Sequence, residues 1–150
     1  MKSIYLFAFL IFASWSISSD AACTTKYKSH LRGAPTTDAS IISSLPKFSP
    51  LQIVETQNHW VKVKGLKFEG WIFHSLIDKD LECMSVKDTN NSFCPSKRNQ
   101  KTRDIVATEG FRILKKEIGC NQVLDKYGKR IWLNNISAWP ESTSMKILIN

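Results

Sequence analysis

Four cysteines and three histidines are the side chains of this sequence with the widest chemistry. They are Cys23, Cys83, Cys94, Cys120, His30, His59 and His74. A catalytic cysteine needs a free thiol beside a histidine, and a zinc site needs three or four ligands, often at short fixed spacings. No histidine lies at metal-ligand spacing from a cysteine or from another histidine. The sequence also has no phosphate-binding glycine loop, paired-carboxylate motif or Gly-x-Ser-x-Gly elbow, so we predict no catalytic residue, no metal and no cofactor.

The chain begins with a segment typical of export. Lys2 precedes an unbroken apolar run over residues 4–13, and small, mostly polar residues follow it. This order predicts a secretory signal peptide. The apolar run is too short for a bilayer, which needs roughly 18 residues, and no later segment approaches that length, so we expect no transmembrane span. Ser19 and Ala21 fit the small-x-small cleavage rule, which predicts residues 1–21 as the signal peptide and a periplasmic or secreted mature protein.

Lipidation is the alternative to simple cleavage. The Ala22-Cys23 pair resembles a bacterial lipoprotein signal, in which Cys23 would become the lipidated first residue. That signal resembles Leu-small-small-Cys, and this chain has Asp20 where the leucine belongs. We therefore favour cleavage after Ala21, and either site leaves Cys23 in the mature chain.

Export changes what the four cysteines predict, because thiols pair in an oxidising compartment. Their even number indicates two disulfide bonds. Four cysteines allow three connectivities, and the residues alone do not choose among them.

The chain carries a net charge of +8, and removing residues 1–21 leaves that charge unchanged, because Lys2 and Asp20 leave together. An exported cation meets anionic wall polymers, outer-membrane lipids and acidic proteins. The positive charge would suit nucleic acid, but an exported protein does not meet it, so we do not expect nucleic acid as the ligand. The alternative is that the excess charge has no specific partner and only keeps a small protein soluble.

Between Cys23 and Cys83 the sequence alternates short β-branched or aromatic runs with turn residues. The runs are Ile41-Ile42, Leu51-Gln52-Ile53-Val54, Trp60-Val61-Lys62-Val63 and Trp71-Ile72-Phe73. Turn signals such as Lys64-Gly65 separate them, and no interval is long enough for a regular helix. We predict an all-β fold in which roughly 60 residues form a small antiparallel barrel.

The second half repeats the spacing of the first. Phe111-Arg112-Ile113-Leu114 corresponds to the run that begins at Leu51, and the interval from Cys120 to Trp132 corresponds to the interval from Trp60 to Trp71. This match predicts a degenerate second barrel. The predicted organisation is a signal peptide at 1–21, a barrel at 22–81, a degenerate barrel at 82–140 and a tail at 141–150.

The first barrel resembles a bacterial SH3 domain. That family has an Asn/His-Leu-Arg-x-Gly-Pro-like motif, a Val-x-Val strand, a Trp-x-x-Val strand and a closing Gly-Trp-Val-x-x-Ser-x-Leu segment. The corresponding residues here are His30-Leu31-Arg32-Gly33-Ala34-Pro35, Gln52-Ile53-Val54, Trp60-Val61-Lys62-Val63 and Gly70-Trp71-Ile72-Phe73-His74-Ser75-Leu76. The second module departs from the pattern, because its motif is Ser92-Phe93-Cys94-Pro95-Ser96, without the arginine, and Cys120 replaces the tryptophan.

The resemblance also implies a disulfide pattern. The first and last strands of an SH3-type barrel lie side by side, and Cys23 and Cys83 bracket the first module, which implies a bond between them. Cys94 and Cys120 occupy places that resemble neighbours across the second barrel, which implies the second bond. Reduction is then expected to unfold the protein.

A surplus of aromatic side chains in the first module predicts a binding surface. Trp60 alternates with a core valine, and we expect it to face a groove beside Tyr27 and Arg32, with Trp71 nearby. An aromatic and cationic pair suits sugar faces and peptide carboxylates. The alternative is that Trp60 and Trp71 only complete the core.

Domains similar to this one commonly act as targeting modules on cell-wall peptidoglycan. The resemblance therefore implies an exported, non-catalytic protein that binds peptidoglycan, its peptides or another anionic envelope polymer. The alternative is a protein–protein adaptor, or an inhibitor of a secreted enzyme, acting through the basic second module. That module carries a basic run over residues 97–103, with Lys115-Lys116 and Lys129-Arg130.

Overall fold

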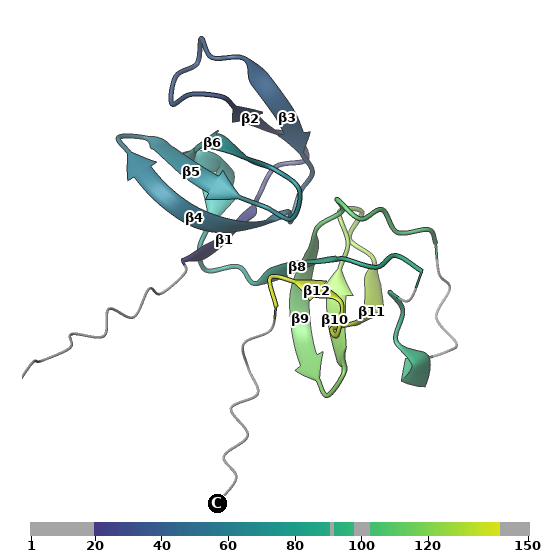
Figure 1. Ribbon diagram of the computed structural model, residues 1–150. Helices are drawn as coiled ribbons and strands as arrows, with labels where there is room; N and C mark the ends of the chain where they lie inside the picture. Colours follow the sequence, from purple (N-terminus) through teal and green to yellow (C-terminus); the bar gives the residue numbers. More distant parts are fainter. Residues whose placement is uncertain (1–19, 91, 98–102, 142–150) are drawn as a thin grey trace, which may run out of the picture.

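The computed structural model describes residues 20–90, 92–97 and 103–141, and these form an all-β protein of two antiparallel sheets (Figure 1). The first sheet has seven strands in the order β3-β2-β6-β5-β4-β1-β7, and the second has five in the order β11-β10-β9-β8-β12. The predicted all-β fold is confirmed. Most of the predicted signal peptide and nearly all of the predicted tail lie outside the described residues.

The strands are short, and only two single-turn helices accompany them among the described residues. The first sheet contains β1 (Ala21–Thr24), β2 (Ser29–Arg32), β3 (Ile41–Leu45), β4 (Pro50–Gln57), β5 (Trp60–Lys64), β6 (Glu69–Phe73) and β7 (Ile77–Asp78), with the 3-10 helix η1 (His74–Leu76) after β6. The second contains β8 (Cys83–Val86), β9 (Phe111–Glu117), β10 (Cys120–Leu124), β11 (Arg130–Asn134) and β12 (Ala138–Trp139), with the 3-10 helix η2 (Pro95–Lys97) after β8.

Each sheet encloses its own apolar core, built by alternation along its strands. In the first sheet the buried residues are Leu31, Leu45, Leu51, Val61, Val63 and Ile72. In the second they are Met84, Val86, Ile105, Phe111, Val123, Ile131, Leu133 and Ala138. The predicted role of Val61 and Val63 as inward-facing residues is therefore confirmed.

The central hairpins of the two sheets follow the same pairing pattern. Lys62 pairs with Trp71 between β5 and β6, and Gln122 pairs with Trp132 between β10 and β11. The β4–β5 and β9–β10 hairpins each have a register shift, which leaves Val54 of β4 and Leu114 of β9 as the extra residue. Bulges of this kind increase strand twist. The shared register supports the predicted second copy of the first module.

The Cys23–Cys83 disulfide joins the two sheets. Cys23 lies on β1 of the first sheet, and its Cα is 6.0 Å from that of Cys83. Cys83 lies two residues beyond the predicted end of the first barrel at residue 81, on β8, which pairs with β9 and β12 of the second sheet. The implied pairing is therefore present, and the bond connects the two modules.

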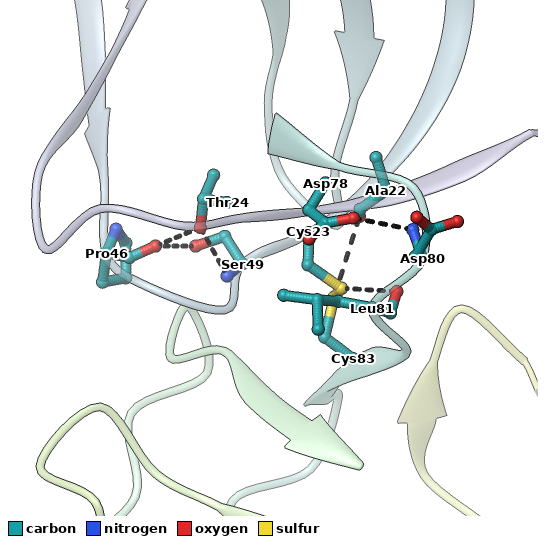
Figure 2. The surroundings of a disulfide bond; sticks show 9 residues. All are labelled: Ala22, Cys23, Thr24, Pro46, Ser49, Asp78, Asp80, Leu81 and Cys83. Carbon is teal, nitrogen blue, oxygen red and sulfur yellow. Dashed lines mark hydrogen bonds between the residues drawn. A yellow bond between two sulfur atoms is a disulfide. The ribbon is translucent and has the colours of Figure 1, made fainter. Parts of the chain in front are cut away.

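The surroundings of this bond are shown in Figure 2. The sulfur of Cys23 lies 3.1 Å from the Leu81 carbonyl oxygen, and that of Cys83 lies 3.7 Å from the Ala22 carbonyl oxygen. A sulfur engaged in a disulfide has no valence left for a lipid thioether. This geometry therefore counts against the lipoprotein alternative.

A second contact between the sheets is made by backbone alone. A Cβ added to Gly110, which immediately precedes β9, would collide with the Phe48 carbonyl group and the Ser49 amide nitrogen. Glycine is required wherever two backbones approach this closely. Gly110 thus allows the second sheet to pack against the loop between β3 and β4.

The first strand extends to the edge of the predicted signal peptide. Ala21 pairs with Gln52, and the Ile53 amide donates a hydrogen bond of 2.8 Å to the Asp20 carbonyl oxygen. Cleavage after Ala21 would remove both interactions and leave Ala22 to begin the strand.

Candidate ligand-binding face

The outer face of β2, β6 and β5 gathers the aromatic and cationic side chains of the first sheet. Strand pairing places Arg32 opposite Trp71, Trp71 opposite Lys62, and Trp60 opposite Phe73. Because residues two apart share one face of a strand, these five side chains lie on the side of the sheet away from the core. We call them the outer aromatic face.

The two tryptophans of this face differ in exposure. Trp71 is only 9% exposed, whereas Trp60 is half-buried. The Trp60 ring packs edge-on against Phe73, with ring centres 5.5 Å apart, a favourable arrangement for an aromatic pair. Trp60 and Phe73 are therefore the aromatic surface that a ligand can reach, and Trp71 lies beneath its neighbours.

The cations of the face are held beside these rings. The Arg32 Nη1 atom donates a hydrogen bond of 2.6 Å to the Ala39 carbonyl oxygen. The Lys62 ammonium lies 3.4 Å from a carboxylate oxygen of Glu69, in a partly exposed ion pair. Such pairs contribute little to stability, roughly 0–1 kcal/mol, so an anionic ligand can compete for Lys62 at small cost.

Two histidines extend the aromatic cluster past the ends of β5 and β6. The ring centres of His59 and His74 are 5.3 Å apart, and Phe73 lies 4.9 Å from His74 and 6.0 Å from His59. The His74 amide donates a hydrogen bond of 2.9 Å to the His59 carbonyl oxygen, which continues the strand pairing by one step. Both histidines are exposed.

Tyr27 occupies a different place from the one that the sequence predicted. It is 70% exposed, and the Lys47 ammonium lies 5.2 Å from its ring centre. The same ammonium lies 4.9 Å from the centre of the Phe48 ring. The described contacts therefore group Tyr27 with the loop between β3 and β4, and they group Trp60 with Phe73.

Phe73, His59 and His74 were not predicted from the sequence as members of this cluster. A signal for them was present, because the hairpin register follows from Trp60-Val61-Lys62-Val63 and Gly70-Trp71-Ile72-Phe73. Because Trp60 lies opposite Phe73, the residue before Trp60 (His59) and the residue after Phe73 (His74) must also be neighbours.

The second sheet has different chemistry on the equivalent face. Cys120 takes the place of Trp60, and Asn134 takes the place of Phe73. Cys120 forms a disulfide with Cys94, with their Cα atoms 5.9 Å apart, as the resemblance implied. The hydroxyl of Ser96 lies 3.7 Å from one sulfur and 3.9 Å from the other. A covalent bond thus replaces an aromatic pair.

Basic residues of the second module make ion pairs within it. Lys97 lies 3.6 Å from Glu117 and 4.5 Å from the centre of the Trp132 ring. Lys115 also pairs with Glu117, at 2.9 Å. Residues 98–102 of the predicted basic run lie outside the described residues. Because Lys97 and Lys115 already pair with Glu117, they are less available to an anionic partner than the number of basic residues in this module indicated.

Arg103, at the end of that run, belongs to a buried ion network. Its guanidinium donates hydrogen bonds to both carboxylate oxygens of Glu109, and its Nη2 atom lies 3.1 Å from Asp125. Glu109 and Asp125 are 4% and 1% exposed. Hydrogen bonding to Glu109, and then to Asp125, raises the pKa of the Arg103 guanidinium. The residue stabilises the fold of the second module.

A cleft of about 440 Å³ lies between the sheets beside the Cys23–Cys83 disulfide. Leu81, Met84 and Ala138 are among the apolar residues that line it. The charged residues of its lining include two ion pairs, Lys79 with Asp20 at 3.5 Å and Lys116 with Glu82 at 2.8 Å. Asp20 belongs to the predicted signal peptide, so cleavage after Ala21 would leave Lys79 without this partner. The outer aromatic face, with its accessible ring pair and two cations, is the stronger candidate site.

The described part of the chain contains no helix long and apolar enough to cross a membrane. Within the same residues, no group of three or more His, Cys, Asp or Glu side chains is placed to hold a metal ion. The two disulfides fit a protein that folds outside the cytoplasm.

Comparison with known proteins gives a family for the first sheet. Residues 30–78 match the family described as bacterial SH3 domain. The solved structures of NlpC2 and NlpC1 from Trichomonas vaginalis are similar to this chain at 12% and 17% identity, with TM-scores of 0.40 and 0.39. The matches cover 85% and 89% of this chain, which spans about half the length of each of those proteins, 50% in both cases. No curated protein matches the chain.

Proposed function

Because residues 30–78 of this chain are a bacterial SH3 domain, we propose that the protein is an exported, non-catalytic module that binds cell-wall peptidoglycan. The outer aromatic face is the binding surface. The observation that carries the proposal is the pairing of Trp60 with Phe73 on an accessible sheet face, beside Arg32 and Lys62.

The chemistry of this face fits the chemistry of the wall. Aromatic rings pack against the apolar faces of sugars, and their edge-on pairing fixes the rings before a ligand arrives. Arginine and lysine form charge-assisted hydrogen bonds with carboxylates, such as those of wall peptides. Lys62 is held only by an exposed ion pair, so it is available for this role.

Co-sedimentation with insoluble sacculi tests the proposal. Mature protein is expected to pellet with sacculi stripped of their anionic secondary polymers, and Trp60→Ala is expected to weaken binding roughly tenfold, equal to about 1.4 kcal/mol. Tyr127→Ala is the matched control, because it removes an exposed aromatic ring from the second module. Melting curves establish that both variants are folded.

The outcomes separate this proposal from the alternatives. Protein that stays in the supernatant at low salt contradicts wall binding. Pelleting only with unstripped sacculi identifies a polyanion as the ligand. Binding that is lost in a Lys115→Ala/Lys116→Ala variant but kept in Trp60→Ala transfers the site to the second module and overturns the proposal.

A further inference from the structure

His59 and His74 form a pair of exposed imidazoles side by side at the end of the outer aromatic face. The hydrogen bond from the His74 amide to the His59 carbonyl oxygen is 2.9 Å long, and it ties the two backbones together. The ring of Phe73 lies against both imidazoles, which limits their rotation. The two ring planes are inclined by 32°, with centres 5.3 Å apart.

This separation suits a shared metal ion. Zinc binds a histidine nitrogen at roughly 2.0–2.1 Å, and two imidazoles on one tetrahedral ion have ring centres about 5 Å apart. Neutral imidazole is a good ligand for zinc, copper and nickel, whereas magnesium and calcium prefer oxygen. Water can complete the coordination, because both side chains are exposed.

We propose that His59 and His74 together bind one divalent transition-metal ion, with Zn²⁺ and Ni²⁺ as the probes of the site. The site has two protein ligands, so it is an open, exchangeable site and not a structural one. It lies at the end of the outer aromatic face, and it does not depend on wall binding.

The second sheet provides the same hairpin register without the ligands. The Asn135 amide donates a hydrogen bond of 3.1 Å to the Gly119 carbonyl oxygen, as His74 does to His59. Gly119 and Asn135 follow the hairpin turn and β11 just as the two histidines follow the turn and β6. A His59→Gly/His74→Asn variant therefore removes both imidazoles and installs the residues found at the corresponding register positions of the second hairpin.

Metal titration of the untagged mature protein tests the site. Isothermal titration with Zn²⁺ and with Ni²⁺ at neutral pH is expected to give one ion per chain. His59→Gln and His74→Gln are each expected to weaken binding at least about tenfold, since loss of even a supporting residue costs that much at known sites. Chemical shifts of the two imidazoles in NMR spectra should move on metal addition.

His30→Ala is the matched control, because His30 lies on β2 and bonds Ser44 at 3.1 Å. It is expected to bind metal as the wild type does. No heat of binding and no shift of the imidazole signals at millimolar metal would overturn the proposal. Unchanged affinity in the folded His59→Gly/His74→Asn variant would overturn it too, because the ion would then be held elsewhere.

Discussion

The two sheets share a backbone pattern and differ in the side chains placed on it. In the first sheet, the outer face and its end carry Trp60, Phe73, His59 and His74. The second sheet has Cys120, Asn134, Gly119 and Asn135 at the corresponding places. The hairpin register is the same, so the scaffold does not require the aromatic residues. This difference supports a binding role for the face of the first sheet.

The turns that follow β5 and β10 also differ in their buried side chains. In the first sheet, the Phe68 ring covers Gly65, and a Cβ at that glycine would collide with it. In the second sheet, the corresponding turn begins with the buried Asp125, which receives hydrogen bonds from the Tyr127 and Lys129 amides and from Arg103. The turn after β5 is therefore packed by the apolar ring of Phe68, whereas the turn after β10 is held by hydrogen bonds to the Asp125 carboxylate.

The largest effect is expected from separating the two sheets. A Cys23→Ala/Cys83→Ala variant opens a loop of 60 residues, and its free energy of unfolding should fall by about 4 kcal/mol. Removal of the Cys94–Cys120 bond, whose loop is 26 residues, should cost less, about 3.5 kcal/mol. Urea unfolding of both variants measures the difference.

Because the first bond joins two modules, its loss is also expected to change cooperativity. Tryptophan fluorescence and far-ultraviolet circular dichroism should give separate transitions in the Cys23→Ala/Cys83→Ala variant and coincident ones in the variant without Cys94–Cys120. Coincident transitions in both variants would contradict the assignment of the first bond to the interface between the sheets.

A somewhat smaller effect is expected from Asp125→Ala. This change removes one of the two carboxylates that bind the Arg103 guanidinium and the acceptor of two backbone amides, and losing one partner of a buried ion pair costs about 3 kcal/mol. The measurement is again urea unfolding. Lys126→Ala, in the same turn, should change stability by less than about 0.5 kcal/mol. Equal values for the two variants would show that charge does not stabilise this turn.

The smallest expected effect is that of Gly110→Ala. The added Cβ meets backbone atoms of Phe48 and Ser49, which cannot move aside as a flexible side chain would, and overpacking of this kind costs about 2 kcal/mol. Gly33→Ala is the control, because its Cβ would meet the Ser40 hydroxyl at 3.6 Å and an Ile42 methyl group at 3.9 Å, both ordinary contact distances. Thermal melting that ranks Gly33→Ala below Gly110→Ala would contradict the close approach of the sheets.

Strand positions and the core alternation were predictable from the sequence, because a period of two residues fixes which side chains are buried. Two groups of residues were not predictable. Tyr27 lies in a loop whose path no periodicity determines, and Arg103 reaches buried carboxylates that are distant from one another in sequence.

The order of the disulfides along the chain has a consequence for biosynthesis. Cys23 pairs with Cys83 and Cys94 pairs with Cys120, so each cysteine is bonded to its immediate neighbour in the cysteine series. A chain that emerges from a translocation pore with its amino end first would present its thiols in the order in which they must be oxidised. Such a protein can reach its native connectivity with an oxidase alone, without help from a disulfide isomerase.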